Sequence, residues 1–302
     1  MTGTACAPAV ESACTALVRV APAAVQRISV GTDTVVYRVR LDDGRRTIVK
    51  LFAAGRRHGA AEETRLLHAI AADGRIAVPG VVASGPVPGL GTTAVITTDA
   101  GSRTLGDAVR AGQMPQSAAL VRLALLMNAF HSIAPPRGVR LAPCLSDQVS
   151  ALARHCPRAV FAQLTTALEV IAQGVSQDRM VWCHGDLHLE NAVLSATPAV
   201  TSGRSRLPER LVDFEATTLC VAEYDLAQTL VTCSVLEPAD RLFLAAAYGR
   251  PVNLQLVTAF TAFQAVRGWT YAAQREGRHR ALWAARMRQA LSLDVRTERT
   301  AP

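Results

Sequence analysis

Apolar residues recur at every second position early in the chain and at helical spacing later on. The odd-numbered positions of 35–41 are apolar, residues 42–44 supply an Asp-Asp-Gly turn, and Thr47–Phe52 continues as the second strand of a hairpin. Residues 60–72 place three large apolar side chains on one helical stripe, and Thr92–Thr98 reads as a further strand. The pattern predicts a small lobe made of strands and one helix.

Beyond Gly101 the pattern becomes mostly helical. Ser117–Ile133 and Phe161–Val175 have the spacing of amphipathic helices, and the chain is helical again from Asp225 to about Leu293. The other segments of this half are an apolar, strand-like run at Met180–Leu187, an exposed loop at Thr197–Glu209 and a short strand at Leu211–Phe214.

These patterns predict an α+β fold of two lobes. We expect residues 1–99 to form a β-rich N-terminal lobe and residues 100–302 a larger, mainly helical C-terminal lobe. A chain of 302 residues is long enough for each lobe to bury its own core. Hydrophobic residues make up 50% of the chain and charged residues 19%, and this balance excludes a disordered protein.

The charge and the cysteines narrow the class of protein further. A net charge of +8 would by itself fit a nucleic acid or a phosphorylated ligand, but the arginines are scattered and aromatic residues are only 5%, which argues against nucleic acid. The seven cysteines are odd in number and lack metal-ligand spacing, as is typical of a reduced, cytoplasmic protein.

The N-terminus has no cationic stretch before an apolar run, and no window of about 18 residues is wholly apolar. We therefore expect no signal peptide and no membrane partner.

A group of polar residues follows the strand-like run that begins at Met180. Asp186 and Asn191 are five positions apart, a spacing that lets one loop place both side chains at one site. Asp213 comes after two apolar strand residues, where a carboxylate is costly unless it is paired or binds a metal. Phosphoryl transfer needs a carboxylate that orients the attacking hydroxyl, hard oxygen ligands for Mg²⁺, and a cation that offsets the charge of the triphosphate. Asp186 suits the first role, and Asn191 and Asp213 suit the second.

These residues resemble the aminoglycoside phosphotransferase and choline kinase-like family, whose members have a bilobal, protein-kinase-like fold. That family has His-Gly-Asp followed by Asn, then an apolar-Asp-aromatic-Glu segment, then Tyr-Asp-Leu-Ala. The matching residues here are His184-Gly185-Asp186, Asn191, Val212–Glu215 and Tyr224–Ala227. The chain departs from the pattern at Cys220–Ala222, where the family often has Gly-Asp-Pro. The resemblance implies a kinase with Asp186 as catalytic residue, Mg²⁺ as cofactor and ATP or GTP as phosphate donor.

The resemblance also assigns residues to nucleotide binding. Lys50 would reach the α- and β-phosphates, although an edge lysine that extends to solvent is the alternative. Glu63 would pair with Lys50, because it shares the buried face of the helix 60–72 whereas Glu62 is turned toward solvent. Gly31 and Thr32 would cover the phosphates, although an ordinary β-turn would also explain them.

The remaining candidates support the loop or contact the acceptor. By resemblance His184 and Asp225 support the backbone of the catalytic loop, and Asp225 also suits the N-cap of the helix that follows. Candidate acceptor contacts are His188, Glu190, Glu215 and Trp269. For His188 a structural role stays open, for Glu190 a place in solvent, and for Trp269 a place in the core.

The sequence thus predicts transfer of the γ-phosphate of ATP or GTP to a hydroxyl of an antibiotic or related natural product. A metabolite kinase and a non-catalytic nucleotide-binding regulator stay open. A protein kinase is disfavoured because no activation segment ends in Ala-Pro-Glu. Six arginines lie between residues 267 and 288 while carboxylates are scarce after residue 227, which argues against a polycationic acceptor. The acceptor itself, the preferred donor and the oligomeric state are left open.

Overall fold

The computed structural model describes residues 7–30, 34–54, 57–134, 144–194, 207–274 and 279–295. Their contacts divide the chain into two compact units. The first unit holds the described residues of Met1–Ser102 and of Val193–Glu215, and the second holds those of Arg103–Pro135, Leu141–Ala192 and Ala216–Pro302. The first unit therefore includes Val193–Glu215, a segment that the expected division at residue 99 assigns to the C-terminal lobe.

The first unit is built on one antiparallel sheet with strand order β1-β2-β3-β5-β4. The strands are β1 (Pro22–Val30), β2 (Thr34–Leu41), β3 (Arg46–Phe52), β4 (Val81–Pro86) and β5 (Thr93–Thr98). In the central strand β3, Lys50 pairs with Val36 of β2 and Val95 of β5. The edge strand β4 lies partly in a stretch whose Gly and Pro residues favour a loop. Proline is tolerated there because an edge strand has one unpaired side.

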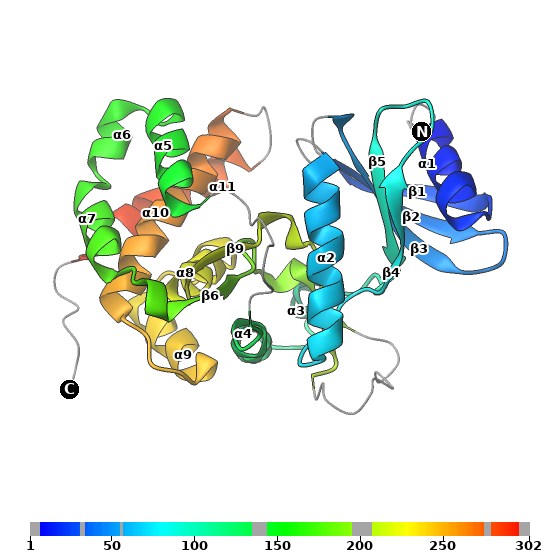
Figure 1. The fold of residues 1–302 in the computed structure, drawn as a ribbon. Helices are drawn as coiled ribbons and strands as arrows, with labels where there is room; N and C mark the ends of the chain where they lie inside the picture. Colours follow the sequence, from blue (N-terminus) through cyan, green and yellow to red (C-terminus); the bar gives the residue numbers. More distant parts are fainter. Residues whose placement is uncertain are drawn as a thin grey trace. The chain divides into compact units, whose positions relative to one another are not determined.

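The two faces of this sheet pack against different helices (Figure 1). Helix α1 (Ala7–Ala13) and the π-helical turn η1 (Cys14–Val18) cover the face that carries Val49 and Leu51. Helix α2 (Arg57–Asp73) covers the other face, where Phe52 and Val95 pack against it. Strand alternation places Lys50 on the α2 face, next to Phe52.

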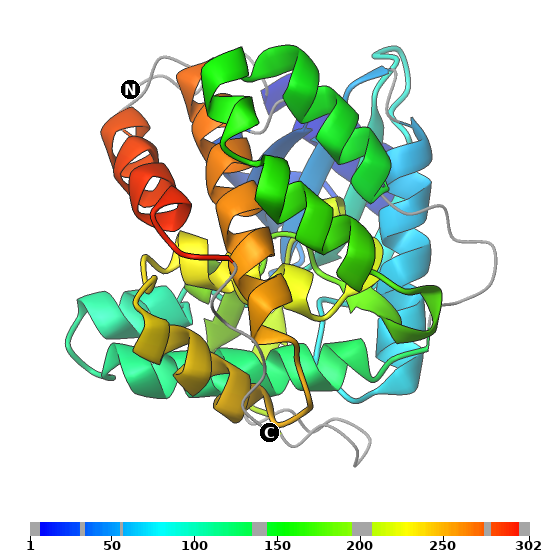
Figure 2. The ribbon, with the colours of Figure 1, turned by 90° about the vertical axis from the view of Figure 1, so that its left-hand side faces the viewer.

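The second unit is mainly helical and has α10 at its centre (Figure 2). Residues 256–266 of α10 are all buried, so that helix is surrounded by protein on every side. The helices of this unit are α3 (Leu105–Arg110), α4 (Gln116–His131), α5 (Leu145–His155), α6 (Arg158–Ala162), α7 (Thr165–Gly174), α8 (Glu223–Thr232), α9 (Pro238–Tyr248), α10 (Leu254–Ala273) and α11 (Arg280–Leu291). Within the described part of the chain, every helix is too short or too polar to cross a membrane.

Two short strand pairs complete the described elements. In the second unit, strand β6 (Met180–Cys183) pairs antiparallel with β9 (Thr218–Val221). Strand β7 (Ala192–Leu194) pairs with β8 (Glu209–Leu211), almost entirely within the segment Val193–Glu215 of the first unit. The short turns η3 (Gln177–Arg179), η4 (Leu189–Asn191) and η5 (Phe214–Ala216) connect these elements.

Three local expectations from the sequence need correction. The helix expected at Phe161–Val175 is two helices, because the N–H groups of Gln163 and Leu164 bond to carbonyls three residues back instead of continuing the α-helical ladder. Glu209, expected in an exposed loop, is fully buried at the start of β8, while residues 197–206 lie outside the described residues. The strand expected at Leu211–Phe214 ends at Leu211. Its extended backbone cannot continue through Asp213, whose φ is 64°.

Candidate active site

In the first unit, one buried ammonium group lies among three carboxylates. The Nζ atom of Lys50 is 3.1 Å from Oε2 of Glu63, 3.2 Å from Oδ1 of Asp213 and 3.1 Å from Oε2 of Glu215. The Lys50 side chain is only 8% exposed. Thr34 donates a hydrogen bond of 3.3 Å to the same oxygen of Glu215. Three carboxylates around one cation leave net negative charge, which suits a place where further cations bind.

The charge of Lys50 is fixed by this environment. Burial lowers the pKa of Lys50, but the charges of Glu63, Asp213 and Glu215 outweigh burial and raise that pKa above its usual value. Glu63, from α2, is the partner that we expected for Lys50. Glu62 pairs instead with Arg65, one turn along the same helix. The lysine is therefore a permanent cation that is held at the α2 face of the sheet.

Asp213 has a backbone conformation that few residues adopt. Its φ of 64° lies in the left-handed region, where a side chain with a Cβ is disfavoured. Such conformations cluster at functional sites, where the surrounding structure enforces them. Here the left-handed residue lies two positions after the end of β8, and its carboxylate contacts Lys50.

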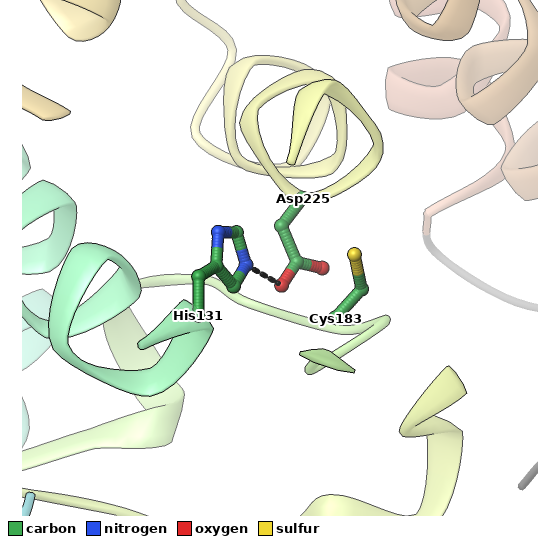
Figure 3. A group of neighbouring side chains, drawn as sticks. All are labelled: His131, Cys183 and Asp225. Carbon is green, nitrogen blue, oxygen red and sulfur yellow. Dashed lines mark hydrogen bonds and ion pairs between the residues drawn. The ribbon is translucent and has the colours of Figure 1, made fainter. Parts of the chain in front are cut away.

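In the second unit, a single buried carboxylate fixes the loop that follows β6 (Figure 3). Asp225 of α8 accepts backbone N–H bonds from His184 at 2.6 Å and from Gly185 at 2.9 Å. It also lies 3.0 Å from Nε2 of His131 in α4. Asp225 is fully buried, and these hydrogen bonds offset the free-energy cost of burying its carboxylate. Helix α8 begins at Glu223, so Asp225 lies within its first turn and is not the N-cap that we considered.

Three potential metal ligands meet at this carboxylate, namely His131, Cys183 and Asp225 (Figure 3). Each already has a protein partner. Nδ1 of His131 is 2.9 Å from the hydroxyl of Tyr248, and Sγ of Cys183 donates to the carbonyl of Val221. Burial raises the pKa of Cys183 well above its usual value, so the sulfur stays a thiol. The cluster is therefore a hydrogen-bonded support and not a metal centre.

Gly185 allows the loop to pass close to the chain after η5. Its φ is 79°, and a Cβ atom at this position would lie 2.1 Å from the carbonyl oxygen of Ala216. Both the dihedral angle and the close approach require glycine. On its other side the loop is supported by His184, whose ring packs edge-on against Phe130 with centroids 6.2 Å apart.

Asp186 follows directly and keeps a solvent-accessible carboxylate, with 42% of its side chain exposed. Burial raises the pKa of Asp186, but the hydrogen bond and charge of His188, with the charges of His184 and Arg267, outweigh burial and lower that pKa. Oδ1 also accepts a hydrogen bond of 3.3 Å from Gln228. Asp186 is thus ionised, oriented and open to a ligand.

Asn191 presents the right atom for a metal. Its Nδ2 donates to the backbone carbonyl of Asp186 at 2.8 Å, which leaves the amide oxygen as the atom available for coordination. Asp213 offers carboxylate oxygens on a side chain that is 49% exposed. Both are hard oxygen donors of the kind that Mg²⁺ prefers, so the residues fit this cation.

His188 and Glu190 form a charged network with α3. Glu190 lies 3.0 Å from Nδ1 of His188 and 2.6 Å from Nη1 of Arg110. The hydrogen bond from His188, with that of Arg110, lowers the pKa of Glu190 to about 2 despite burial. Burial lowers the pKa of His188, but hydrogen bonds to Asp186 and Glu190 outweigh it and raise the pKa to about 9. His188 is therefore cationic at neutral pH.

The other sequence candidates are distributed as follows. The first unit brings together the four candidates Lys50, Glu63, Asp213 and Glu215. The second unit contains the candidates His184, Asp186, His188, Glu190, Asn191 and Asp225. Trp269 packs against the helical core of the second unit. Gly31 and Thr32 lie outside the described residues.

Several residues of the site were missed from the sequence. His131 follows an apolar helical stripe, and Gln228 lies in the middle of α8, so neither carried a signal of contact with the loop. The family motif containing Tyr224 and Asp225 was the one signal that could have directed attention to their partners. It did not identify Arg267, whose Nη1 donates to the Tyr224 hydroxyl.

Comparisons with known proteins identify the family and the fold of the chain. Residues 24–269 match the sequence profile of the phosphotransferase enzyme family. Curated protein sequences give no match. Among solved structures, the chain is similar to the GDP complex of aminoglycoside 2'-phosphotransferase-IIIa, with a TM-score of 0.66, 15% identity, and 94% of this chain and 97% of that chain covered.

Two further solved structures share this fold, and their names refer to other substrates. An amicoumacin kinase in complex with AMP-PNP, Ca²⁺ and its antibiotic has a TM-score of 0.65 and 13% identity, and the match covers 88% of this chain and 87% of that one. A choline/ethanolamine kinase family protein from Mesorhizobium loti has a TM-score of 0.56 and 14% identity, with 88% and 86% covered. The fold is therefore that of the protein-kinase-like phosphotransferases, as the sequence predicted.

Replacing Gly185 by Ala should destabilise the protein by roughly 2–4 kcal/mol, because the new Cβ would strain a left-handed backbone and collide with Ala216. Thermal or denaturant unfolding measures the loss. Gly112→Ala is the matched control, since Gly112 also has a positive φ of 67° but nothing lies within 4 Å of the position that its Cβ would take. Equal losses for the two variants would show that the close approach at Gly185 does not matter.

Glu190→Gln should lower the melting temperature by about 1–3 °C, and the difference should depend on pH. The depressed pKa of Glu190 makes its contribution complete above about pH 4.5 and lost as the pH falls through about 2. The raised pKa of His188 makes its contribution complete below about pH 6.5 and lost as the pH rises through about 9. The difference should therefore be largest near pH 5–6.5 and shrink toward pH 9.

Asp107→Asn is the control for this pH series, because Asp107 pairs with Arg110 and caps α3 without contacting His188. Its effect on the melting temperature should stay constant between pH 6.5 and 9. A difference for Glu190→Gln that is equally constant over this range would contradict the pairing of Glu190 with a cationic His188.

Proposed function

Because the chain belongs to the phosphotransferase enzyme family, we propose that it transfers the γ-phosphate of ATP or GTP to a hydroxyl group of an antibiotic or related natural product. The observation that carries the proposal is Asp186. It is an ionised, accessible carboxylate on a loop whose backbone is fixed by Asp225. A carboxylate in this state can accept a proton from a bound hydroxyl, and the rigid loop keeps it in position.

Each residue of the proposed mechanism has a distinct task. Asp186 orients the acceptor hydroxyl and takes its proton late in the reaction, because the transition state of phosphoryl transfer is loose and demands little of a base. Lys50 offers a permanent positive charge to the α- and β-phosphates, and Glu63 holds the ammonium in place. Positioning and charge neutralisation supply most of the rate.

Asn191 and Asp213 are the residues that we propose as ligands of Mg²⁺. When bound, the cation offsets the negative charge on the triphosphate oxygens. Asn191 is prepared for this role because its amide nitrogen is already bonded to the carbonyl of Asp186. One carboxylate oxygen of Asp213 contacts Lys50, so in this proposal Asp213 lies between the metal ion and the residue that binds the phosphates.

Glu215 belongs to the nucleotide side in this proposal. Its carboxylate lies against Lys50 and Thr34, which favours a role in holding the ammonium group over the acceptor contact that we considered from the sequence. Trp269 likewise supports the helical core rather than an acceptor wall.

The acceptor class and location are the finer parts of the proposal. Structures named for aminoglycoside and amicoumacin kinases support an antibiotic, and one named for the choline/ethanolamine kinase family supports a small metabolite instead. A cytoplasmic location follows from the need for a nucleoside triphosphate.

Asp186→Asn should lower kcat by roughly 10²–10⁴-fold while nucleotide affinity stays near wild type, because the amide keeps the shape but cannot accept the proton. Acceptor-stimulated ADP or GDP release measures kcat, and Asp178→Asn, an exposed aspartate on η3, is the control. Full activity in Asp186→Asn would refute its assignment as the catalytic residue.

Asp213→Ala should weaken Mg²⁺-dependent nucleotide binding by more than about tenfold, since it removes an oxygen ligand of the cation. Isothermal titration with a non-hydrolysable nucleotide, with and without Mg²⁺, measures the affinity. Asp99→Ala is an unsuitable control because Asp99 braces Arg38 and Arg46, so Asp42→Ala, at an exposed position in the turn after β2, serves instead. An unchanged affinity would count against the metal role of Asp213.

A further inference from the structure

Helices α5 and α10 line an open pocket of about 550 Å³ within the second unit. This volume lies in the range of pockets that bind small organic molecules. Asp147, Gln148, Ser150 and Arg154 line it from α5, and Arg267 and Tyr271 line it from α10. The wall thus combines an aromatic ring with several hydrogen-bonding groups, as in sites that fix the orientation of a ligand.

Arg267 is held rigidly at the wall of this cavity. Its Nη1 donates to Oε1 of Gln148 at 2.5 Å and to the hydroxyl of Tyr224 at 2.6 Å. The Tyr224 hydroxyl in turn donates to Gln148 at 2.7 Å, and the guanidinium carbon lies 5.8 Å from the Tyr224 ring centroid. Both bonds start from Nη1, so within the described ranges the other N–H groups of Arg267 are left for a ligand. A pre-positioned guanidinium loses little freedom on binding.

Arg267 also connects the cavity to the catalytic loop. Arg267 bonds to Tyr224 of α8, and Gln228, one turn further along α8, donates to Oδ1 of Asp186. Residues four apart on a helix lie on the same face, so this face of α8 joins the cavity wall to the carboxylate that takes the proton in the proposed mechanism.

The charged side chains of the cavity favour negative ligands. Arg154 and Arg267 bring two guanidinium groups, and Asp147 brings one carboxylate, which already accepts a hydrogen bond from Cys144. A ligand with several positive charges would meet two like charges for each opposite one. A ligand with a carboxylate or phosphate would meet the reverse, and guanidinium groups bind such groups with two parallel hydrogen bonds.

We infer that this cavity holds the acceptor and that the acceptor carries an anionic group, a carboxylate or a phosphate, which Arg267 binds. The inference rests on the proposed phosphotransferase function and narrows its substrate class. It excludes polycationic acceptors, and it makes Arg267 a residue that determines specificity.

The test compares acceptors that share a scaffold and differ in charge. Glucuronate, glucuronamide and glucosamine form one such set, and hydroxylated natural products with a free carboxylate, the matching amide and an amine form others. Nucleotide release by the full chain with Mg²⁺ should favour the anionic member by at least about tenfold in kcat/KM. Arg267→Gln should remove most of that preference and leave the nucleotide affinity unchanged, whereas Arg158→Gln, on the neighbouring α6 outside the cavity, should keep it.

The decisive readout is the ratio of kcat/KM for the anionic acceptor to kcat/KM for the neutral acceptor. A general loss of activity through Asp186 would lower both rates and leave the ratio alone. A preference for the neutral or cationic member, or a preference that survives in Arg267→Gln, would overturn the inference while phosphoryl transfer itself stands. Absence of nucleotide binding would instead refute the proposed function.

A second measurement needs no acceptor. Ser150→Cys places a thiol in the cavity, in a background where Cys6 and Cys144 are replaced by Ser. Burial raises the pKa of Cys233 to about 11, so that thiol reacts slowly. The measured quantity is the ratio of the reaction rates of an anionic and a cationic methanethiosulfonate. This ratio should be higher for the cavity thiol than for free 2-mercaptoethanol, and Arg267→Gln should lower it. Faster reaction with the cation would overturn the inference even if the acceptor panel gave no product.

Discussion

The structure of the loop that follows β6 depends on the buried carboxylate of Asp225. It binds two consecutive backbone N–H groups and one histidine, and so joins α4, α8 and the chain that leaves β6. An N–H group buried without a partner costs roughly 1–3 kcal/mol, so removal of this one side chain would leave two such costs at once. Other conformations of the loop would leave these N–H groups without partners, so the position of Asp186 is set by a residue that is itself fully buried.

The two units prepare opposite charges. In the first, three carboxylates surround Lys50 and keep its ammonium charged in spite of burial. In the second, burial raises the pKa of Asp186, and the hydrogen bond and charge of His188 are the main influences that outweigh burial and lower that pKa. The fold thus favours the charged form of both Lys50 and Asp186. Charges that are arranged in advance require little rearrangement during the reaction, and this is where most electrostatic catalysis originates.

The sequence predicted the polar motifs and the principal elements, but not the contacts that support them. Alternation placed Lys50 on β3, and helical spacing selected Glu63 over Glu62, because both rules act over a few residues. The partners of Asp225, Gln228 and Arg267 come from segments forty or more residues away, and no local pattern encodes such a pairing. The split of the helix at residues 163 and 164 was missed for a related reason, since burial of Leu164 at a helix break satisfies the same apolar spacing as a continuous helix.

The excess of carboxylates at Lys50 has a consequence for the lifetime of the chain. Three negative groups around one positive group repel each other more than they would in the unfolded chain, and this repulsion offsets part of what the ion pairs of Lys50 contribute to the stability of the ligand-free first unit. Any cation that binds only the folded state shifts the equilibrium toward it by mass action. Resistance to proteases would then rise and fall with the supply of metal and nucleotide, so the cell would retain the protein when its phosphate donor is abundant and degrade it faster when the donor is scarce.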